Sequence, residues 1–330
     1  MTTIKKRYKL KYNNIFKILI ILLIPIVVFV LYNNYVKLDK KEKKKINKKH
    51  IEERIKEEYK FKLNYSKTIS IPKSILDTVS NSNPSIVISD ENGIVLANTK
   101  ENDRREGAST TKIFIGYAAL KLLDLEKDKI IESQYSLDEC NPYCNNRLET
   151  DEKLDVIEAS TYVFPDSSNS VATDIAIAIG KKYNKVKNEE EAEEKGLTKI
   201  NEFIKELGCT NTHLGNANGL NTTPKETDNN FEISTGYPKD NSIDGMSAND
   251  LALVTTLAMK DNNFAQGIKT NSKIFYIKSG KGFFCHGVWG FSYNNKMYYI
   301  TILGVNCNKG DDKNLLVNSL YNWTIKDLIN

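Results

Sequence analysis

The sequence predicts an α/β (α+β) fold, in which an antiparallel sheet flanked by N- and C-terminal helices lies beside a mainly helical subdomain. Two strand-like runs open the globular part, helical patterns fill its middle, and three strand-like runs precede a closing helix. This order lets the first and last elements complete one sheet, while the central helices form a second region. We expect a functional site in the crevice between the two regions.

An apolar run predicts a membrane anchor at residues 15–33, after a basic tail at residues 1–14. The run from Ile15 to Tyr32 is apolar except for Lys17, and a helical span needs about 17 residues or more. A cleaved signal peptide is the alternative, but no small-residue cleavage pattern follows the apolar core. Only the distal flank contains acidic residues, which favours a cytoplasmic tail, one span of the cell membrane and an extracytoplasmic C-terminal domain.

A charged stalk is predicted at residues 34–70, which leaves residues 71–330 for the globular domain. The formal net charge is +5, but residues 1–70 hold 19 basic and 6 acidic residues, whereas the rest of the chain holds 28 basic and 36 acidic ones. The domain itself is therefore mildly acidic, and we expect no nucleic-acid partner.

The first half of the domain predicts a hairpin and then helices. Residues 85–89 and 94–97 are strand-like and flank Asn92-Gly93, a pair that favours a type I′ turn because it tolerates positive φ angles. The spacing of apolar residues then predicts three helical segments, at residues 113–123, 170–182 and within 188–207.

The second half predicts a return to the sheet. A polar loop is expected at residues 221–245, and a tight turn is expected at Asn294-Asn295. The remaining elements are a helix at residues 250–259, strands at 273–278, 287–293 and 296–305, and a closing helix at 315–328.

The chain has five cysteines. Cys140 and Cys144 are spaced to close a small loop, and an odd total leaves at least one thiol unpaired. A metal site at this pair is the alternative, but the chain has only three histidines and no H-E-x-x-H pattern. We expect no metal and no cofactor.

Three short motifs occur in one order along the chain, and the first pairs a serine with a lysine. Ser109 and Lys112 are three residues apart at the start of an apolar helix, so their side chains share one helix face. A serine hydroxyl needs a base before it can act as a nucleophile. A lysine serves as that base only when it is neutral, which burial and a nearby cation favour. Lys278 is the candidate second cation.

The other two motifs are Ser167-Ser-Asn169, before a helix, and Lys278-Ser279-Gly280, at the end of a strand. Glycine there lets a ligand backbone lie close to the strand. A second match to the first motif, Ser70-Ile-Pro-Lys73, is attributed to chance because it contains a proline and opens no apolar helix. Ser247-Ala-Asn249 also matches the second motif and is the alternative to Ser167-Ser-Asn169.

These residues resemble the serine D-alanyl-D-alanine carboxypeptidases, low-molecular-mass penicillin-binding proteins of the β-lactamase-like superfamily, for which this motif set is known. The resemblance covers roughly residues 85–305. It rests on five segments: residues 104–112 (Arg-Arg-Glu-Gly-Ala-Ser-Thr-Thr-Lys), 165–172 (Pro-Asp-Ser-Ser-Asn-Ser-Val-Ala), 207–213 (Leu-Gly-Cys-Thr-Asn-Thr-His), 218–220 (Asn-Gly-Leu) and 247–252 (Ser-Ala-Asn-Asp-Leu-Ala).

The resemblance implies a hydrolase that removes terminal D-alanine from the peptidoglycan stem peptides of the bacterial cell wall. It implies that Ser109 is acylated, that Lys112 is its base, that Ser167 relays a proton to the leaving amine and that Asn169 holds the substrate amide. β-Lactam antibiotics would then act as covalent inhibitors.

The resemblance also implies how the substrate is bound. Lys278 and Ser279 would hold the terminal carboxylate beside Gly280, and the backbone N–H groups of Ser109 and Lys281 would form the oxyanion hole. Two departures from the family pattern bear on this region: Ser279 replaces the usual threonine, and Lys281-Gly282 replaces an aromatic residue and a threonine.

Three other functions are compatible with parts of the sequence. A class A-like β-lactamase needs a further glutamate, for which Glu149, Glu152 and Glu158 are candidates, although none has the usual Glu-x-x-Leu-Asn setting. A catalytically inactive wall-binding or sensing homologue would not need the intact motifs. A Ser-His-Asp hydrolase is disfavoured because no G-x-S-x-G pattern occurs.

Overall fold

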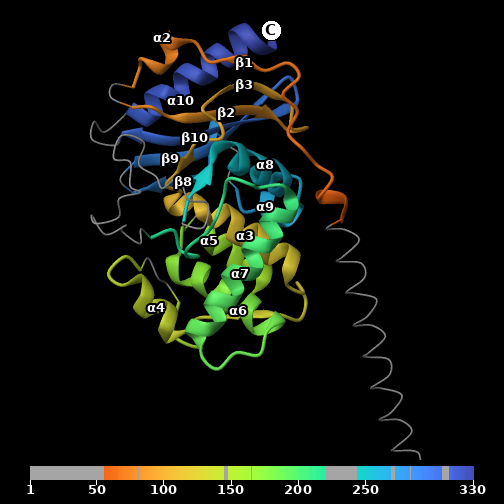
Figure 1. Cartoon of the computed structure of the whole chain (residues 1–330), viewed down its shortest axis with the longest axis vertical. Helices are drawn as coiled ribbons and strands as arrows, with labels where there is room; N and C mark the ends of the chain where they lie inside the picture. Colours follow the sequence, from red (N-terminus) through yellow and green to blue (C-terminus); the bar gives the residue numbers. More distant parts are fainter. Residues whose placement is uncertain are drawn as a thin grey trace, which may run out of the picture. The chain divides into compact units, whose positions relative to one another are not determined.

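A computed structural model describes residues 56–79, 82–144, 148–164, 166–220, 244–268, 272–282, 284–306 and 312–330 (Figure 1). The predicted tail, the predicted span at 15–33 and the predicted stalk up to residue 55 lie outside these ranges, as does most of the polar loop at 221–245. No helix within the described ranges is long and apolar enough to cross a membrane.

A six-stranded sheet forms one half of the domain, with its strands in the order β1-β3-β2-β10-β9-β8. Neighbouring strands are antiparallel except for β1 and β3, which are parallel. The predicted fold class is confirmed. The strands are β1 (Ile69–Ser70), β2 (Ser85–Asp90), β3 (Val95–Thr99), β8 (Ile274–Lys281), β9 (Phe284–Tyr293) and β10 (Lys296–Asn306).

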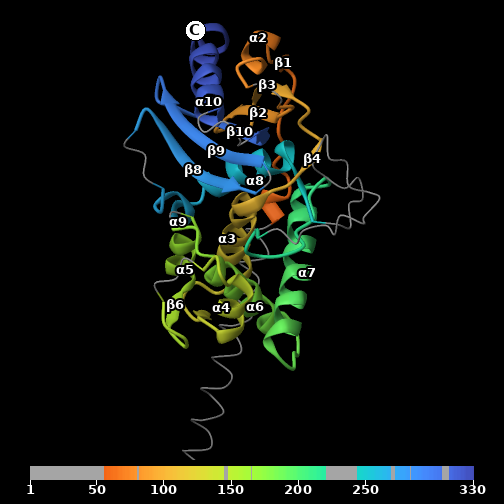
Figure 2. The ribbon, with the colours of Figure 1, turned by 90° about the vertical axis from the view of Figure 1, so that its left-hand side faces the viewer.

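Both faces of the sheet are covered, which explains why β2 and β10 are buried along most of their length. On one face lies α10 (Asp312–Trp323), followed by a π-helical turn, Thr324–Ile329. Leu316 and Leu320 of α10 belong to the same core as Ile300 of β10, and α2 (Lys73–Leu76) lies nearby (Figures 1 and 2). The opposite face is covered by α8 (Ala248–Met259).

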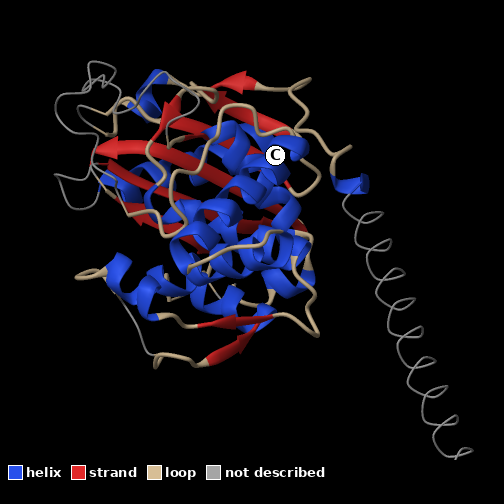
Figure 3. Ribbon diagram, turned by 60° about the horizontal axis from the view of Figure 1, so that its bottom comes forward, coloured by secondary structure: helices blue, strands red, loops and turns tan. Residues whose placement is uncertain are grey.

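The helical half of the domain surrounds α3 (Figures 1 and 2), the most buried helix of the chain's described part, and Figure 3 shows this half beside the sheet. Every residue of α3 is buried, including Lys112 and Lys121, so these two charged side chains need partners inside the domain. A small two-stranded sheet, β5 with β6, lies in this half, and a second one joins β4 to β7. The helices are α3 (Thr111–Leu122), α4 (Gln134–Cys140), α5 (Val156–Val163), α6 (Asn169–Tyr183), α7 (Glu189–Leu207) and α9 (Asn262–Ala265). The short strands are β4 (Arg104–Arg105), β5 (Lys129–Ile131), β6 (Lys153–Asp155) and β7 (Met246–Ser247).

The two predicted tight turns have different outcomes. Asn294 and Asn295 join β9 to β10 and both have positive φ angles, 51° and 59°, as a type I′ turn requires. The hairpin predicted around Asn92-Gly93 is confirmed, since β2 and β3 pair antiparallel, but its type I′ turn is wrong, because only Gly93 has a positive φ angle there. The carboxylate of Asp90 accepts the N–H groups two and four residues later, at 2.9 and 2.8 Å, and closes a wider turn.

The segment before β1 packs on the domain, and the compact unit begins at Glu57. Asn64 donates its backbone N–H to the C=O of Gly93 at 2.8 Å and accepts the N–H of Val95 at 2.8 Å. Glu58 forms an ion pair with Lys121 of α3 at 2.6 Å. Part of the predicted stalk, residues 57–70, is therefore attached to the domain that it precedes.

Candidate active site

The candidate nucleophile lies where a loop turns into the buried helix. Ser109 is in a single 3-10 turn, Ala108–Thr110, that leads directly into α3. Ala108 has a positive φ angle of 44°, which is strained for a residue other than glycine and is typical of functional sites. The N–H groups of Thr110 and Thr111 are already bonded, to the C=O groups of Gly107 and Ala108, so this end of the helix acts through its dipole. Negative charge that develops beside Ser109 is therefore stabilised by this helix end.

Lys112 connects the first motif to the second. Its Nζ lies 3.2 Å from Oγ of Ser109 and 2.7 Å from Oδ1 of Asn169. Its third partner is the backbone C=O of Asn218. The side chain is completely buried, and all three partners are uncharged groups, so no carboxylate in this contact set holds the proton on the amine.

The electrostatic environment favours a neutral Lys112. Burial, and secondarily the positive charge of Lys278, lower the pKa of Lys112 well below its usual range. Burial also lowers the pKa of Lys278, to about 7, although the carboxylate of Asp166 opposes that shift. The geometry therefore gives Ser109 a basic amine within hydrogen-bonding distance at neutral pH.

The third motif lies beside the nucleophile on β8, the edge strand of the sheet. A Cβ atom added to Gly280 would lie 2.9 Å from the backbone N of Ser109, so only glycine permits this approach. Lys278 is buried and donates to the C=O of Phe164 at 2.9 Å. Ser279 and Lys281 alternate with these residues and are exposed, on a strand whose outer edge can pair with an extended peptide.

The second motif has its asparagine at the first position of α6. Asn169 is buried between Lys112 and the backbone C=O of Tyr143, to which its Nδ2 donates at 2.7 Å. Ser168, not Ser167, caps the helix. Ser167 is partly exposed and has a positive φ angle of 56°, which marks a second strained position at the site.

Two contributors to the site were missed by the sequence predictions, and both act through backbone oxygens. The first is Asn218, whose C=O accepts from Lys112. Gly219 follows with a φ angle of 71°, and a Cβ atom there would lie only 2.2 Å from the O of Ala108. The second is Tyr143. A backbone oxygen carries no residue-type signal, although the Asn218-Gly219 pair is a signal for an unusual turn.

Cys140 and Cys144 form a disulfide, so the two sulfurs are not available as a pair of metal-binding thiolates. The prediction that at least one thiol stays unpaired is confirmed by Cys209, which is free and buried. Cys285 is also part of a disulfide.

The rival motif matches have structural roles. The hydroxyl of Ser247 caps α8 by accepting the N–H of Asp250 at 3.1 Å. Lys73 is exposed and pairs with Asp77. The three glutamates considered for a β-lactamase are exposed as well: Glu149, Glu152 and Glu158. Glu158 completes a capping box at the start of α5.

A comparison with models of known protein families identifies the family of this chain. A family model described as D-alanyl-D-alanine carboxypeptidase matches residues 72–310. The chain belongs to this family. It is thus a low-molecular-mass penicillin-binding protein with serine D-alanyl-D-alanine carboxypeptidase activity. A comparison with curated protein sequences finds no match.

Solved structures share the fold. The K15 DD-transpeptidase of Streptomyces is 17% identical with a TM-score of 0.53, and the match covers 72% of this chain and 96% of that one. A variant of the same enzyme gives 18% identity and a TM-score of 0.55, with 72% and 97% covered. Penicillin binding protein 6B from Escherichia coli is 17% identical with a TM-score of 0.52, with 73% and 76% covered.

Proposed function

We propose that this chain is a membrane-anchored carboxypeptidase that removes terminal D-alanine from peptidoglycan stem peptides through an acyl-enzyme on Ser109. The observation that carries the proposal is the distance of 3.2 Å between Oγ of Ser109 and Nζ of Lys112, at an amine whose pKa burial and Lys278 lower. Such a pair is a nucleophile with its base.

In the proposed acylation step, Oγ of Ser109 attacks the carbonyl of the penultimate D-alanine while Lys112 accepts the hydroxyl proton. The N–H groups of Ser109 and Lys281 bind the oxyanion that develops on the carbonyl oxygen. The C–N bond breaks as Lys112 returns this proton, through Ser167, to the amine of the terminal D-alanine, which then leaves. Water then hydrolyses the ester and regenerates the hydroxyl.

Substrate binding is proposed to use the two sides of the site. Asn169 holds the amide of the substrate from the α6 side. Lys278, as an ammonium group, and the exposed hydroxyl of Ser279 hold the terminal carboxylate from the β8 side. Gly280 allows the peptide backbone to lie against the strand.

Mass spectrometry of the domain after exposure to penicillin tests the nucleophile. We expect one penicilloyl adduct, which peptide mapping places on Ser109, and a stable adduct in preference to the rapid turnover of a β-lactamase. The Ser109→Ala variant should fold but form no adduct and release no D-alanine from a D-alanyl-D-alanine peptide. An adduct that persists in this variant contradicts the assignment.

The anchor is the second part of the proposal. Its support is the apolar run from Ile15 to Tyr32 between lysine-rich flanks, which lies outside the described residues. Expression of the full chain in a bacterium should leave it in the membrane fraction after a carbonate wash, with the domain accessible to external protease. Removal of residues 1–33 should release it, and retention of that shortened chain would contradict a single-span anchor.

A further inference from the structure

The Cys140–Cys144 disulfide lies next to the second motif, and this inference rests on the function proposed above. Cys140 is the last residue of α4 and is buried, and the disulfide joins it to Cys144, four residues later. The loop that it closes contains Tyr143, whose C=O accepts from Nδ2 of Asn169 at 2.7 Å. We propose that this disulfide positions Asn169, so that acylation of Ser109 depends on the redox state of the pair.

The side-chain amide of Asn169 has a defined orientation because each end meets a different group. Its Oδ1 accepts from Lys112 at 2.7 Å, and its Nδ2 donates to the C=O of Tyr143. Rotation of the amide by half a turn would place the NH₂ group against the amine and the oxygen against another carbonyl oxygen. The carbonyl of Tyr143 therefore selects the orientation in which Asn169 contacts the base.

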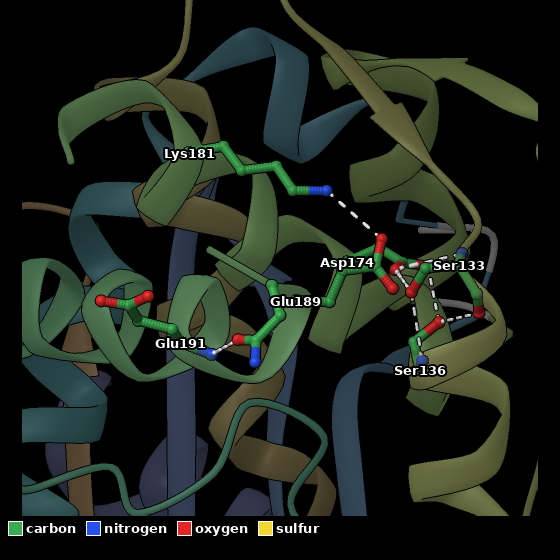
Figure 4. A network of polar contacts seen from close by, with 7 residues as sticks. Ser133, Ser136, Asp174, Lys181, Glu189 and Glu191 are labelled. Carbon is green, nitrogen blue, oxygen red and sulfur yellow. Dashed lines mark hydrogen bonds and ion pairs between the residues drawn. The ribbon is translucent and has the colours of Figure 1, made fainter. Parts of the chain in front are cut away.

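Helix α4 is fixed to α6 at its start, away from the motif. The buried carboxylate of Asp174 on α6 accepts from the hydroxyls of Ser133 and Ser136 at 2.7 and 3.0 Å, and from the N–H of Ser133 at 3.3 Å (Figure 4). Asn169 and Asp174 are both on α6. The α4 segment therefore contacts α6 at two places, through these serines and through Tyr143.

Among the described residues, the end of this segment is restrained by the disulfide and by a few hydrogen bonds, which include the bond from the N–H of Asn141 to the C=O of Asp138 at 3.3 Å. Residues 141–143 are exposed, and the side chain of Tyr143 is 66% exposed, so burial contributes little to the conformation of the loop. One backbone bond, from the N–H of Tyr143 to the C=O of Cys140 at 2.6 Å, lies within the loop. The covalent link limits the conformations from which the carbonyl could leave Asn169.

Reduction removes this restraint. A dithiol reductant transfers two electrons and two protons to the disulfide, which becomes two thiols, while the reductant forms its own disulfide. The loop then gains conformational freedom, the carbonyl of Tyr143 leaves Asn169 for part of the time, and the amide loses its orientation against Lys112. The second-order rate of acylation should fall by about 10- to 100-fold, because small displacements of a catalytic group have effects of this size.

The test compares the wild-type domain with a Cys140→Ala/Cys144→Ala variant. Stopped-flow labelling with a fluorescent penicillin gives the acylation rate per folded molecule, and thermal unfolding is followed on the same samples. The positioning role predicts a rate about 10- to 100-fold lower in the variant at a temperature where both proteins are folded. A merely structural role predicts a lower melting temperature and an unchanged rate.

Titration of the wild type and of the variant with a dithiol distinguishes the effects of the two disulfides on acylation. The wild-type rate should fall to that of the variant, recover on reoxidation, and follow the appearance of thiols at Cys140 and Cys144 in alkylation mass spectra. The variant should not respond to the dithiol. An equal response of both proteins would assign the effect to the disulfide of Cys285 and overturn the inference.

The remaining outcomes are also decisive. Unchanged acylation after complete reduction of Cys140 and Cys144 overturns the inference, and so does an unchanged rate in the variant. Failure of the oxidised wild type to be labelled overturns the proposed function instead. If the variant does not fold, the wild-type titration alone decides. In an Asn169→Ala background the loss of the disulfide should have little further effect, since both changes remove the same contact.

Discussion

Two lysines of α3 are buried nine residues apart and have opposite surroundings. Lys112 contacts a hydroxyl, a side-chain amide and a backbone carbonyl, and Lys278 adds a second positive charge. Lys121 forms ion pairs with Glu58 at 2.6 Å and with Asp261 at 2.9 Å. The groups that contact a buried amine, more than its burial, therefore determine its role. The first arrangement favours a neutral amine, which the proposed base requires, and the second connects a helix to two distant segments.

The largest expected effect is on catalysis and concerns the first lysine. In Lys112→Met the acylation rate should fall by about 10²–10⁴-fold, because the hydroxyl of Ser109 loses its base. Rapid-mixing measurements with a fluorescent penicillin give the rate. A near-normal rate would show that Lys112 is not the base. The two lysines would then not differ in their roles as proposed.

The same substitution at the second lysine should act on stability. In Lys121→Met the free energy of unfolding should fall by about 3 kcal/mol, because Glu58 and Asp261 are left without their buried cation. Urea denaturation measures this change, and the acylation rate of the folded protein should be unaltered. If Lys121→Met slowed acylation as much as Lys112→Met, the two lysines would not have separate roles.

The pH dependence of kcat/KM tests the proposed role of Lys278 in binding the substrate carboxylate. In the proposed mechanism acylation requires a neutral Lys112, so activity should rise as pH increases through its lowered pKa. Carboxylate binding is proposed to require a charged Lys278, so activity should fall as pH rises above its pKa of about 7. The fall should approach tenfold per pH unit, at about 1.4 kcal/mol for each unit. The Lys278→Arg variant, measured on the same D-alanyl-D-alanine peptide, should lack this alkaline decrease because a guanidinium group keeps its proton.

A smaller effect is expected at Glu58. The Glu58→Gln variant keeps an acceptor for the hydroxyl of Tyr117, which donates to Glu58 at 2.6 Å, but loses the charge that faces Lys121. The free energy of unfolding should fall by about 1 kcal/mol, with no change in acylation. Comparison of urea midpoints measures the difference. No loss of stability would show that Asp261 alone is a sufficient partner.

The sequence predicted those parts of the site that depend on residue type and local spacing. Ser109 and Lys112 are close because a helix brings residues three apart onto one face. Lys278 and Gly280 were predicted from a strand that ends in glycine, and the structure places that strand beside the nucleophile. The fold class followed from the order of strand and helix patterns, which local periodicity determines.

Other features depend on contacts that no local pattern encodes. The partners of Lys112 and Asn169 include the backbone oxygens of Asn218 and Tyr143, and every residue type has such an oxygen. Glu58 belongs to a polar segment that resembles a solvated stalk, yet its partner Lys121 is more than 60 residues away in the sequence. The turn type at Asn92-Gly93 was predicted wrongly because the carboxylate of Asp90 accepts the backbone N–H groups of Asn92 and Ile94.

The two glycines that approach the nucleophile have an evolutionary consequence. Side chains at Gly219 and Gly280 would collide with backbone atoms of Ala108 and Ser109, and backbone cannot move aside as a flexible side chain can. Substitution of either glycine is therefore not expected as a route to resistance against a β-lactam that acylates Ser109 as proposed. Natural variation near the site is expected instead at exposed positions such as Lys281.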